Sequence, residues 1–305
     1  MRKHYDDQLA EFECASNMAG ATRAQCQRFL GGVSVKLEPM SVILPREPVL
    51  QTVGFELLAF SLATGKSFGG IVQDAAAAGV SGELCRFWVM LKAFESIDVL
   101  KKIWQQKLGS SVDAMCFTVN LDDVLLDSPH LYRFIDRFYN RNIAASTLFE
   151  INEHCSVAQV AKIQTLITTH GIRAAIDDGD KMQSEVRRDL ASHVEMGKLD
   201  AFTTLRLLSD GYANPAATID EIARHRLGGK PYVIEGVEND MYLRFLQANW
   251  TAGGKVIAQG YGIAPSSPFD EALVPVERFG GHGGYVPAYV VQDCGRRRIG
   301  GQIHG

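Results

Sequence analysis

The chain has 305 residues, of which 46% are hydrophobic and 22% charged, a composition that excludes disorder as its main state. Its 31 Lys and Arg against 35 Asp and Glu give a net charge of −4, so the chain has no global basic field to hold a DNA or RNA polymer. No apolar stretch approaches the about 20 residues of a membrane span, and the charged first residues do not form a signal peptide. We therefore expect a cytoplasmic protein that binds neither membranes nor nucleic-acid polymers.

Three segments of the chain differ in their patterning. Residues 1–32 are polar and partly helical and show no strand pattern, which predicts a helical lead-in. Residues 33–278 alternate between strand-like and helical segments and predict one barrel domain. Residues 279–305 are rich in Gly and Arg and predict a C-terminal tail.

Short apolar runs recur through the middle segment, separated by longer stretches with helical periodicity. The runs are SVKLE, TVGFELL, MCFTVNL, LFEI, RAAID, MGKLD, YVIEGV and KVIAQG. The clearest helices are expected over 67–78, 81–107, 130–139, 157–170 and 240–250. Eight such runs over roughly 230 residues predict an α/β fold of the (β/α)8 TIM type.

Polar side chains stand near the carboxyl ends of six of these runs. They are Glu56, Asn120, Glu150, Asp177 with Asp178, Glu235 and Gln259. Any one of them could be a helix cap or part of a turn, but in a barrel these strand ends meet on one face, where active sites lie. Their oxygen atoms suit Mg²⁺ or Mn²⁺, and burying so many acids together without a cation would be costly. We expect a site for two divalent ions, the usual arrangement for displacement at phosphorus.

In order and spacing, these residues resemble the EAL domain of cyclic di-GMP phosphodiesterases. The matching motifs are Glu56-Leu57-Leu58, Asn120, Glu150-Ile151-Asn152-Glu153, Asp177-Asp178, Lys198-Leu199-Asp200, Glu235-Gly236-Val237-Glu238 and Gln259-Gly260-Tyr261. The resemblance covers about residues 33 to 275. It implies a barrel whose first strand is antiparallel, and hydrolysis of cyclic di-GMP to linear pGpG with Mg²⁺ or Mn²⁺.

The resemblance also implies a role for each matched residue. The metal ions would be surrounded by Glu56, Asn120, Glu150, Asp177, Asp178, Glu235 and Gln259, with Lys198, Glu235 and Glu56 as the catalytic residues. Glu153, Glu238 and Asp200 would support the metal ligands from behind, and Glu153 would brace the loop after Asp177-Asp178. Leu58 and Glu38 would contact the substrate. An ammonium at Lys198 would favour the hydroxide form of a nearby water and could protonate the leaving oxygen.

Three features depart from the family pattern. Phe60 stands where an arginine is expected to contact a substrate phosphate. Glu38 stands where glutamine is usual, and would repel a dianionic ligand unless it points elsewhere. The loop over residues 177–182 lacks the family's aromatic residue and glycines. Arg206 and Lys181 are candidate cations to compensate for Phe60, with solvated surface charge as the alternative.

These departures leave a second function open. The metal residues and Lys198 favour a phosphodiesterase. Phe60, Glu38 and the altered loop favour a non-catalytic protein, either a cyclic di-GMP receptor or a module that binds a regulatory protein partner. A third possibility is another barrel enzyme that abstracts a proton with a Lys base and Mg²⁺. Family habit also implies a homodimer that pairs near the altered loop.

Overall fold

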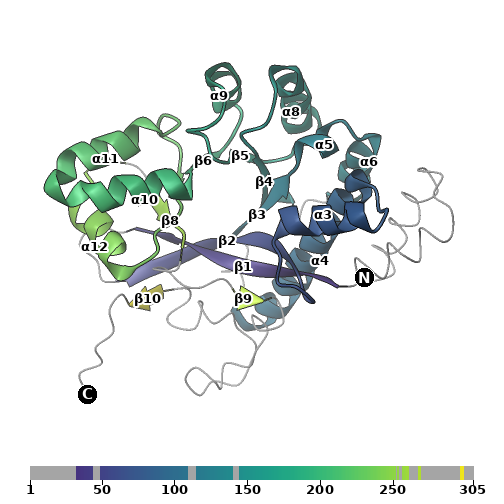
Figure 1. Ribbon diagram of the computed structural model, residues 1–305, viewed down its shortest axis with the longest axis horizontal. Coiled ribbons are helices and arrows are strands. Elements are labelled where there is room, and N and C mark those ends of the chain that lie inside the picture. The colour runs from purple at the N-terminus through teal and green to yellow at the C-terminus, as the bar shows by residue number, and fades with distance from the viewer. Residues whose placement is uncertain are drawn as a thin grey trace.

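The barrel of this protein is closed by eight strands (Figure 1). The computed structural model describes residues 32–43, 49–108, 115–139, 144–251, 253, 256–260, 267–268 and 296–298. The barrel strands are β1 (Val33–Val42), β2 (Val49–Ser61), β3 (Cys116–Leu121), β4 (Thr147–Ile151), β5 (Ala174–Ile176), β6 (Met196–Leu199), β7 (Tyr232–Ile234) and β8 (Val256–Ala258). Each coincides with one of the predicted apolar runs, and the predicted (β/α)8 barrel is confirmed.

The first strand runs against the others. Strands β2 to β8 follow one another in parallel, whereas β1 pairs antiparallel with both β2 and β8 and closes the barrel. The predicted antiparallel first strand is therefore confirmed. In the β1–β2 register, Glu38 lies opposite Glu56 and Lys36 opposite Leu58. Because β1 is reversed, its early residues stand at the same mouth of the barrel as the carboxyl ends of the other strands.

Helices surround this barrel, and the sequence explains where several begin and end. They are α3 (Phe68–Ala77), α4 (Gly82–Leu108), α5 (Asp123–Leu126), α6 (Pro129–Phe138), α8 (Val157–His170), α9 (Ser184–Ala191), α10 (Ala201–Asp210), α11 (Pro215–Arg224) and α12 (Asp240–Asn249). At the start of α8, Gln159 accepts a hydrogen bond from the backbone N–H of Ser156. Gly171 ends α8 with φ of 69°, a conformation that favours glycine. The five predicted helices are present, and α5, α9, α10 and α11 are additional.

The barrel interior is filled at one end by apolar side chains. This plug consists of Met40, Val42, Leu148, Ala175, Met196, Val233 and Ile257. Outside the barrel, two larger apolar clusters pack the strands against the helices. Within the described ranges, no helix combines the length and the hydropathy that crossing a bilayer requires.

The two predicted flanking segments fall mostly outside the described residues. Of the lead-in (1–32), only residue 32 is described. Within 279–305, the backbone of β10 (Arg296–Arg298) pairs with the start of β2. The short β9 (Ser267–Pro268), which belongs to the predicted barrel segment, pairs with β1. The three segment boundaries therefore stay predictions.

Candidate active site

A layer of polar side chains lies directly above the apolar plug. On five strands the polar residue follows a plug residue by two positions: Leu148 and Glu150, Ala175 and Asp177, Met196 and Lys198, Val233 and Glu235, Ile257 and Gln259. Residues two apart on a strand point to the same face, so these side chains share the barrel interior with the plug. Because of this alternation, the polar residues of the five strands form one layer at the carboxyl ends of the strands.

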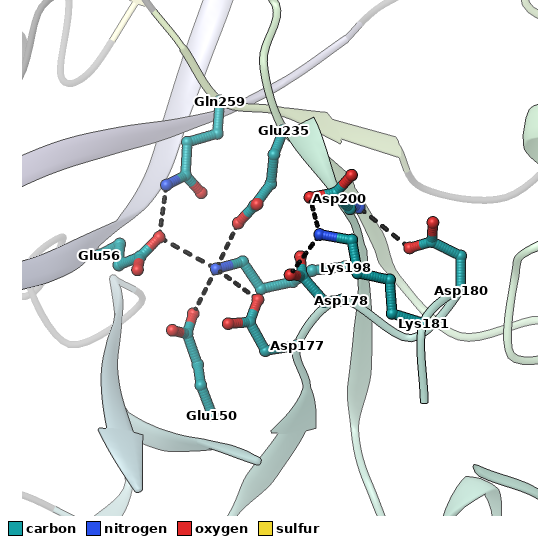
Figure 2. A network of polar contacts seen from close by, with 10 residues as sticks. All are labelled: Glu56, Glu150, Asp177, Asp178, Asp180, Lys181, Lys198, Asp200, Glu235 and Gln259. Carbon is teal, nitrogen blue, oxygen red and sulfur yellow. Dashed lines mark hydrogen bonds and ion pairs between the residues drawn. The ribbon is translucent and has the colours of Figure 1, made fainter. Parts of the chain in front are cut away.

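Lys198 lies at the centre of this layer (Figure 2). Its Nζ atom is 2.5 Å from Glu235, 2.8 Å from Glu150, 3.0 Å from Glu56 and 3.2 Å from Asp177. The Lys198 side chain is 1% exposed and that of Glu150 is fully buried. The structure therefore brings five of the predicted site residues into one ion-paired group.

The charge on Lys198 is fixed by these neighbours. Burial disfavours the ammonium, but the surrounding carboxylates, led by Asp177 and Glu150, hold the pKa of Lys198 well above its usual value. Burial also opposes ionisation of Glu56, yet Lys198 and a hydrogen bond from the Gln259 amide, 2.5 Å long, keep the pKa of Glu56 below its usual value. Lys198 and Glu56 therefore form a charged pair inside the barrel.

One ammonium does not neutralise the whole layer. Burial and repulsion from Glu56 raise the pKa of Glu150 well above its usual value. Burial raises the pKa of Asp177 as well, and burial together with the charges of Glu56 and Asp177 raises the pKa of Glu235 to about 8. Further positive charge would allow all of these acids to ionise at neutral pH.

The residues present fit a hard divalent cation. Ligand oxygens of Asp177, Asp178 and Glu235 lie within 4.8 Å of one another. Glu150 Oε2 and Gln259 Oε1 are buried and accept no hydrogen bond from the described residues. Such orphaned oxygens are costly unless a cation or water satisfies them, and an all-oxygen donor set is the one that Mg²⁺ and Mn²⁺ prefer.

A second ion-paired group adjoins the first and contains Asp178, Lys181 and Asp200 (Figure 2). Lys181 Nζ is 2.6 Å from Asp200 Oδ1 and 3.2 Å from Asp178 Oδ2. Asp178 has a left-handed φ of 46°, which is strained for a residue other than glycine. Burial and the neighbouring Asp177 raise the pKa of Asp178 to about 6. Asp200, predicted to support the ligands, is buried at the N-terminus of α10.

Three other predicted residues lie nearer the rim. Asn120, at the end of β3, lies opposite Glu150 in the strand register but is exposed. Glu238 is exposed after β7. Glu153 lies after β4 with its carboxylate 3.4 Å from the His154 imidazole, and within the described residues no hydrogen bond joins it to 178–182. Their predicted roles stay predictions.

A cavity of about 360 Å³ opens beside the polar layer, between the β1–β2 hairpin, α3 and α4. Glu38, Leu58 and Asn120 line it, in keeping with the predicted contact of Glu38 and Leu58 with substrate. Burial and the charge of Glu56 raise the pKa of Glu38 to about 7, so the repulsion expected from this carboxylate is reduced near neutral pH. Glu38 points into the site region and not away from it.

The cation in contact with the Phe60 ring is neither of the two that the sequence suggested. Arg206 is exposed on α10, which lies across the barrel from α3 in Figure 1. Lys181 forms ion pairs with Asp178 and Asp200. Instead, Lys36 Nζ lies 4.8 Å from the centre of the Phe60 ring, and both residues line the cavity. The signal for Lys36 was its two-residue spacing from Glu38, which puts both side chains on one face of β1.

Comparison with solved structures identifies the fold. The chain superposes on the EAL domain of FimX from Pseudomonas aeruginosa bound to c-di-GMP with a TM-score of 0.56 and 20% identity, over 81% of this chain and 97% of that one. It matches an EAL domain protein from Listeria monocytogenes with a TM-score of 0.58 and 16% identity, over 86% and 98% of the two chains. The chain has the EAL-domain fold.

A third EAL-fold structure, the MucR phosphodiesterase in complex with c-di-GMP, matches with a TM-score of 0.56 and 17% identity, over 81% of this chain and 95% of that one. No family model matches the sequence, and the search of curated proteins finds no relative. At these identities the likeness establishes the EAL fold, and the chemistry of the site rests on the residues described above.

Proposed function

We propose that this chain is a phosphodiesterase of the EAL family that hydrolyses cyclic di-GMP to linear pGpG with Mg²⁺ or Mn²⁺. The observation that carries the proposal is the buried Lys198 ammonium ringed by four acids at the mouth of an EAL-like barrel. When bound, divalent cations would neutralise phosphate charge and activate a water. Phosphodiester hydrolysis needs both effects, together with a proton donor for the leaving oxygen.

The side chains can handle the protons of this reaction. A water attacks the phosphorus, the bond from phosphorus to the ribose O3′ breaks, and O3′ takes up a proton. Glu235 belongs to the group of acids proposed to hold the cation, and in its ionised form its carboxylate is suited to accept the proton of the attacking water. Lys198, held as an ammonium by its acidic neighbours, is suited to donate to O3′.

The cavity supports a nucleotide substrate. It adjoins the acidic layer and combines apolar walls, including Phe60, Phe68 and Met90, with polar groups at Glu38 and Asn120. Apolar walls with a few polar groups are typical of small-molecule sites. The FimX and MucR structures of the same fold contain c-di-GMP, which makes it the first ligand to test.

A non-catalytic receptor for cyclic di-GMP is the second candidate. It is favoured by Phe60 in the cavity wall and by the Lys181 ammonium bound to Asp178, one of the proposed metal ligands. A receptor would bind the nucleotide and leave it intact.

The deciding experiment is incubation of the purified chain with cyclic di-GMP and Mn²⁺ or Mg²⁺, with nucleotides separated by chromatography. Formation of pGpG that is lost in Lys198→Ala would support the enzyme. Intact nucleotide with a measurable heat of binding would instead support the receptor, and no binding at all would contradict both.

We also propose that the chain forms a homodimer through the region of residues 177–182, acts in the cytoplasm, and binds a regulatory protein partner. Light scattering coupled to size-exclusion chromatography, with and without nucleotide, tests the dimer. A monomer under all conditions would contradict the proposed dimer and would leave the proposed phosphodiesterase activity unaffected.

A further inference from the structure

The loop after β5 carries an internal cation beside the proposed metal ligands. Lys181 Nζ contacts Oδ2 of Asp178 at 3.2 Å and Oδ1 of Asp200 at 2.6 Å. Asp178 belongs to the group of three acids whose oxygens lie within 4.8 Å of one another. An ammonium at this distance contacts a carboxylate that a divalent ion would use, and its charge repels that ion.

Hydrogen bonds of Asp200 and of Asp180 fix the surroundings of Lys181. Asp200 begins α10, and its Oδ2 accepts a hydrogen bond of 2.8 Å from the backbone N–H of Thr203. The neighbouring Asp180 accepts one hydrogen bond from the Thr203 hydroxyl at 2.6 Å and another from the backbone N–H of Asp200 at 3.2 Å. These contacts fasten the loop to the start of α10. The ammonium is therefore held beside Asp178 by a fixed partner.

The backbone conformation of Asp178 also supports a fixed contact with Lys181. Asp178 has a left-handed φ of 46°, a conformation that costs more for Asp than for glycine and that surrounding contacts can stabilise. In the described structure the contact to the Asp178 side chain is Lys181. The side chain of Asp178 is thus oriented toward an ammonium in the place where a metal ligand is proposed.

We propose that Lys181 competes with a divalent cation for Asp178 and so restricts the acidic centre to one tightly bound ion. This inference rests on the metal site of the proposed function. A second ion can bind only by displacing Lys181 from Asp178. Lys181 is then the residue that sets the metal stoichiometry of this chain.

Metal binding without nucleotide tests the inference directly. The metal-free protein is titrated with Mn²⁺ while free Mn²⁺ is followed by electron paramagnetic resonance and the heat by calorimetry. The parent chain should bind one Mn²⁺ tightly, and Lys181→Met should gain a second ion or bind about tenfold more tightly. Lys162→Met removes an exposed lysine of α8 that is paired with Asp127, and this variant should behave like the parent. Adding Asp178→Asn to Lys181→Met should cancel the gain.

The outcomes separate this inference from the function on which it rests. If the parent binds Mn²⁺ and Lys181→Met binds it with the same stoichiometry and affinity, the inference is overturned and the metal site stands. Binding of two ions by the parent would overturn it as well. If no variant binds Mn²⁺, the proposed metal site itself fails. Lys181→Gln, which keeps a hydrogen-bonding side chain, should show the same gain and serves if the Met variant does not fold.

Discussion

The Nζ atom of Lys198 lies 2.8 Å from a carboxylate oxygen of Glu150, and both side chains are buried. They come from β6 and β4, which are separated in the sheet by β5 alone, and they meet inside the barrel. A buried charge without its partner is strongly destabilising. Lys198 is therefore the internal counter-ion of the acidic layer as well as the proposed proton donor.

Lys198→Met should lower the free energy of unfolding of the metal-free protein by about 3–5 kcal/mol, because it leaves several buried acids without a counter-ion. Urea unfolding in the presence of a chelator measures this loss, and Lys162→Met provides the comparison. Mn²⁺ should recover part of the lost stability in Lys198→Met, whereas turnover should stay absent. Equal stability of the two variants would show that Lys198 is not the counter-ion.

Asp177→Asn should weaken Mn²⁺ binding by at least about tenfold, since it replaces a charged ligand with a neutral one of the same shape. Asp136→Asn, on the outer face of α6, removes an exposed carboxylate paired with His170 and is the matched control. Calorimetry with Mn²⁺ in the absence of nucleotide gives both affinities. An unchanged affinity in Asp177→Asn would argue strongly against metal at this centre.

Glu38 should make the stability of the metal-free protein depend on pH. Burial raises its pKa from 4.5 to about 7, so the folded state holds the proton more tightly than the unfolded state does. Stability contributed by the protonated form is therefore present below pH 4.5 and is lost as the pH rises to about 7. Glu38→Gln should match the parent near pH 4 and exceed it by on the order of 2 kcal/mol at pH 8.

The control for that titration is Glu185→Gln, which changes an exposed glutamate on α9. Unfolding is followed at fixed pH values between 4 and 8 in chelator. A constant difference between Glu38→Gln and the parent across this range would refute the assigned environment of Glu38.

Lys36→Met should weaken cyclic di-GMP binding by roughly tenfold, because it removes a cation that lines the cavity and has no ion-pair partner within the described residues. Binding is measured by calorimetry with Ca²⁺ in place of Mg²⁺, and the Lys162→Met variant reports any effect of net charge. If both variants bind as tightly as the parent, the nucleotide does not use this cavity.

Gly54→Ala should destabilise the barrel by about 3 kcal/mol, since a Cβ at this position would stand 2.1 Å from the backbone oxygen of Cys116 on the neighbouring strand β3. Gly69→Ala in α3 meets no atom within 4 Å and should leave stability unchanged or improve it slightly. Thermal unfolding of the two variants side by side checks both expectations.

Much of the fold could be predicted because the barrel strands carry continuous apolar runs, and each run became a strand. The sequence pattern did not predict α9, α10 and α11. Of these, α9 has eight residues, four of them charged, so its apolar face is reduced to Val186 and Leu190. Asp200, which begins α10, also belongs to the Lys198-Leu199-Asp200 motif, so the sequence did not single it out as a helix start.

The sequence named the residues of the proposed site, but it did not predict how their charges are arranged. The contacts of Lys198 join residues up to 142 positions apart, and local spacing gives no sign of which acids surround an ammonium. Lys181 likewise contacts Asp200 across 19 positions. Distances across a closed barrel depend on strand order and register, which only the folded structure supplies.

The hydrogen bond from Gln259 to Glu56 spans 203 residues of sequence. A ribosome adds about 5–20 residues per second, so Glu56 is made roughly 10–40 seconds before its partner exists. During that interval β1 and β2 have no closing strand and the acids have no complete enclosure. The site is consequently among the last parts of the nascent protein to form, and a chain interrupted before β8 would leave the ribosome with most of its acids and no assembled centre.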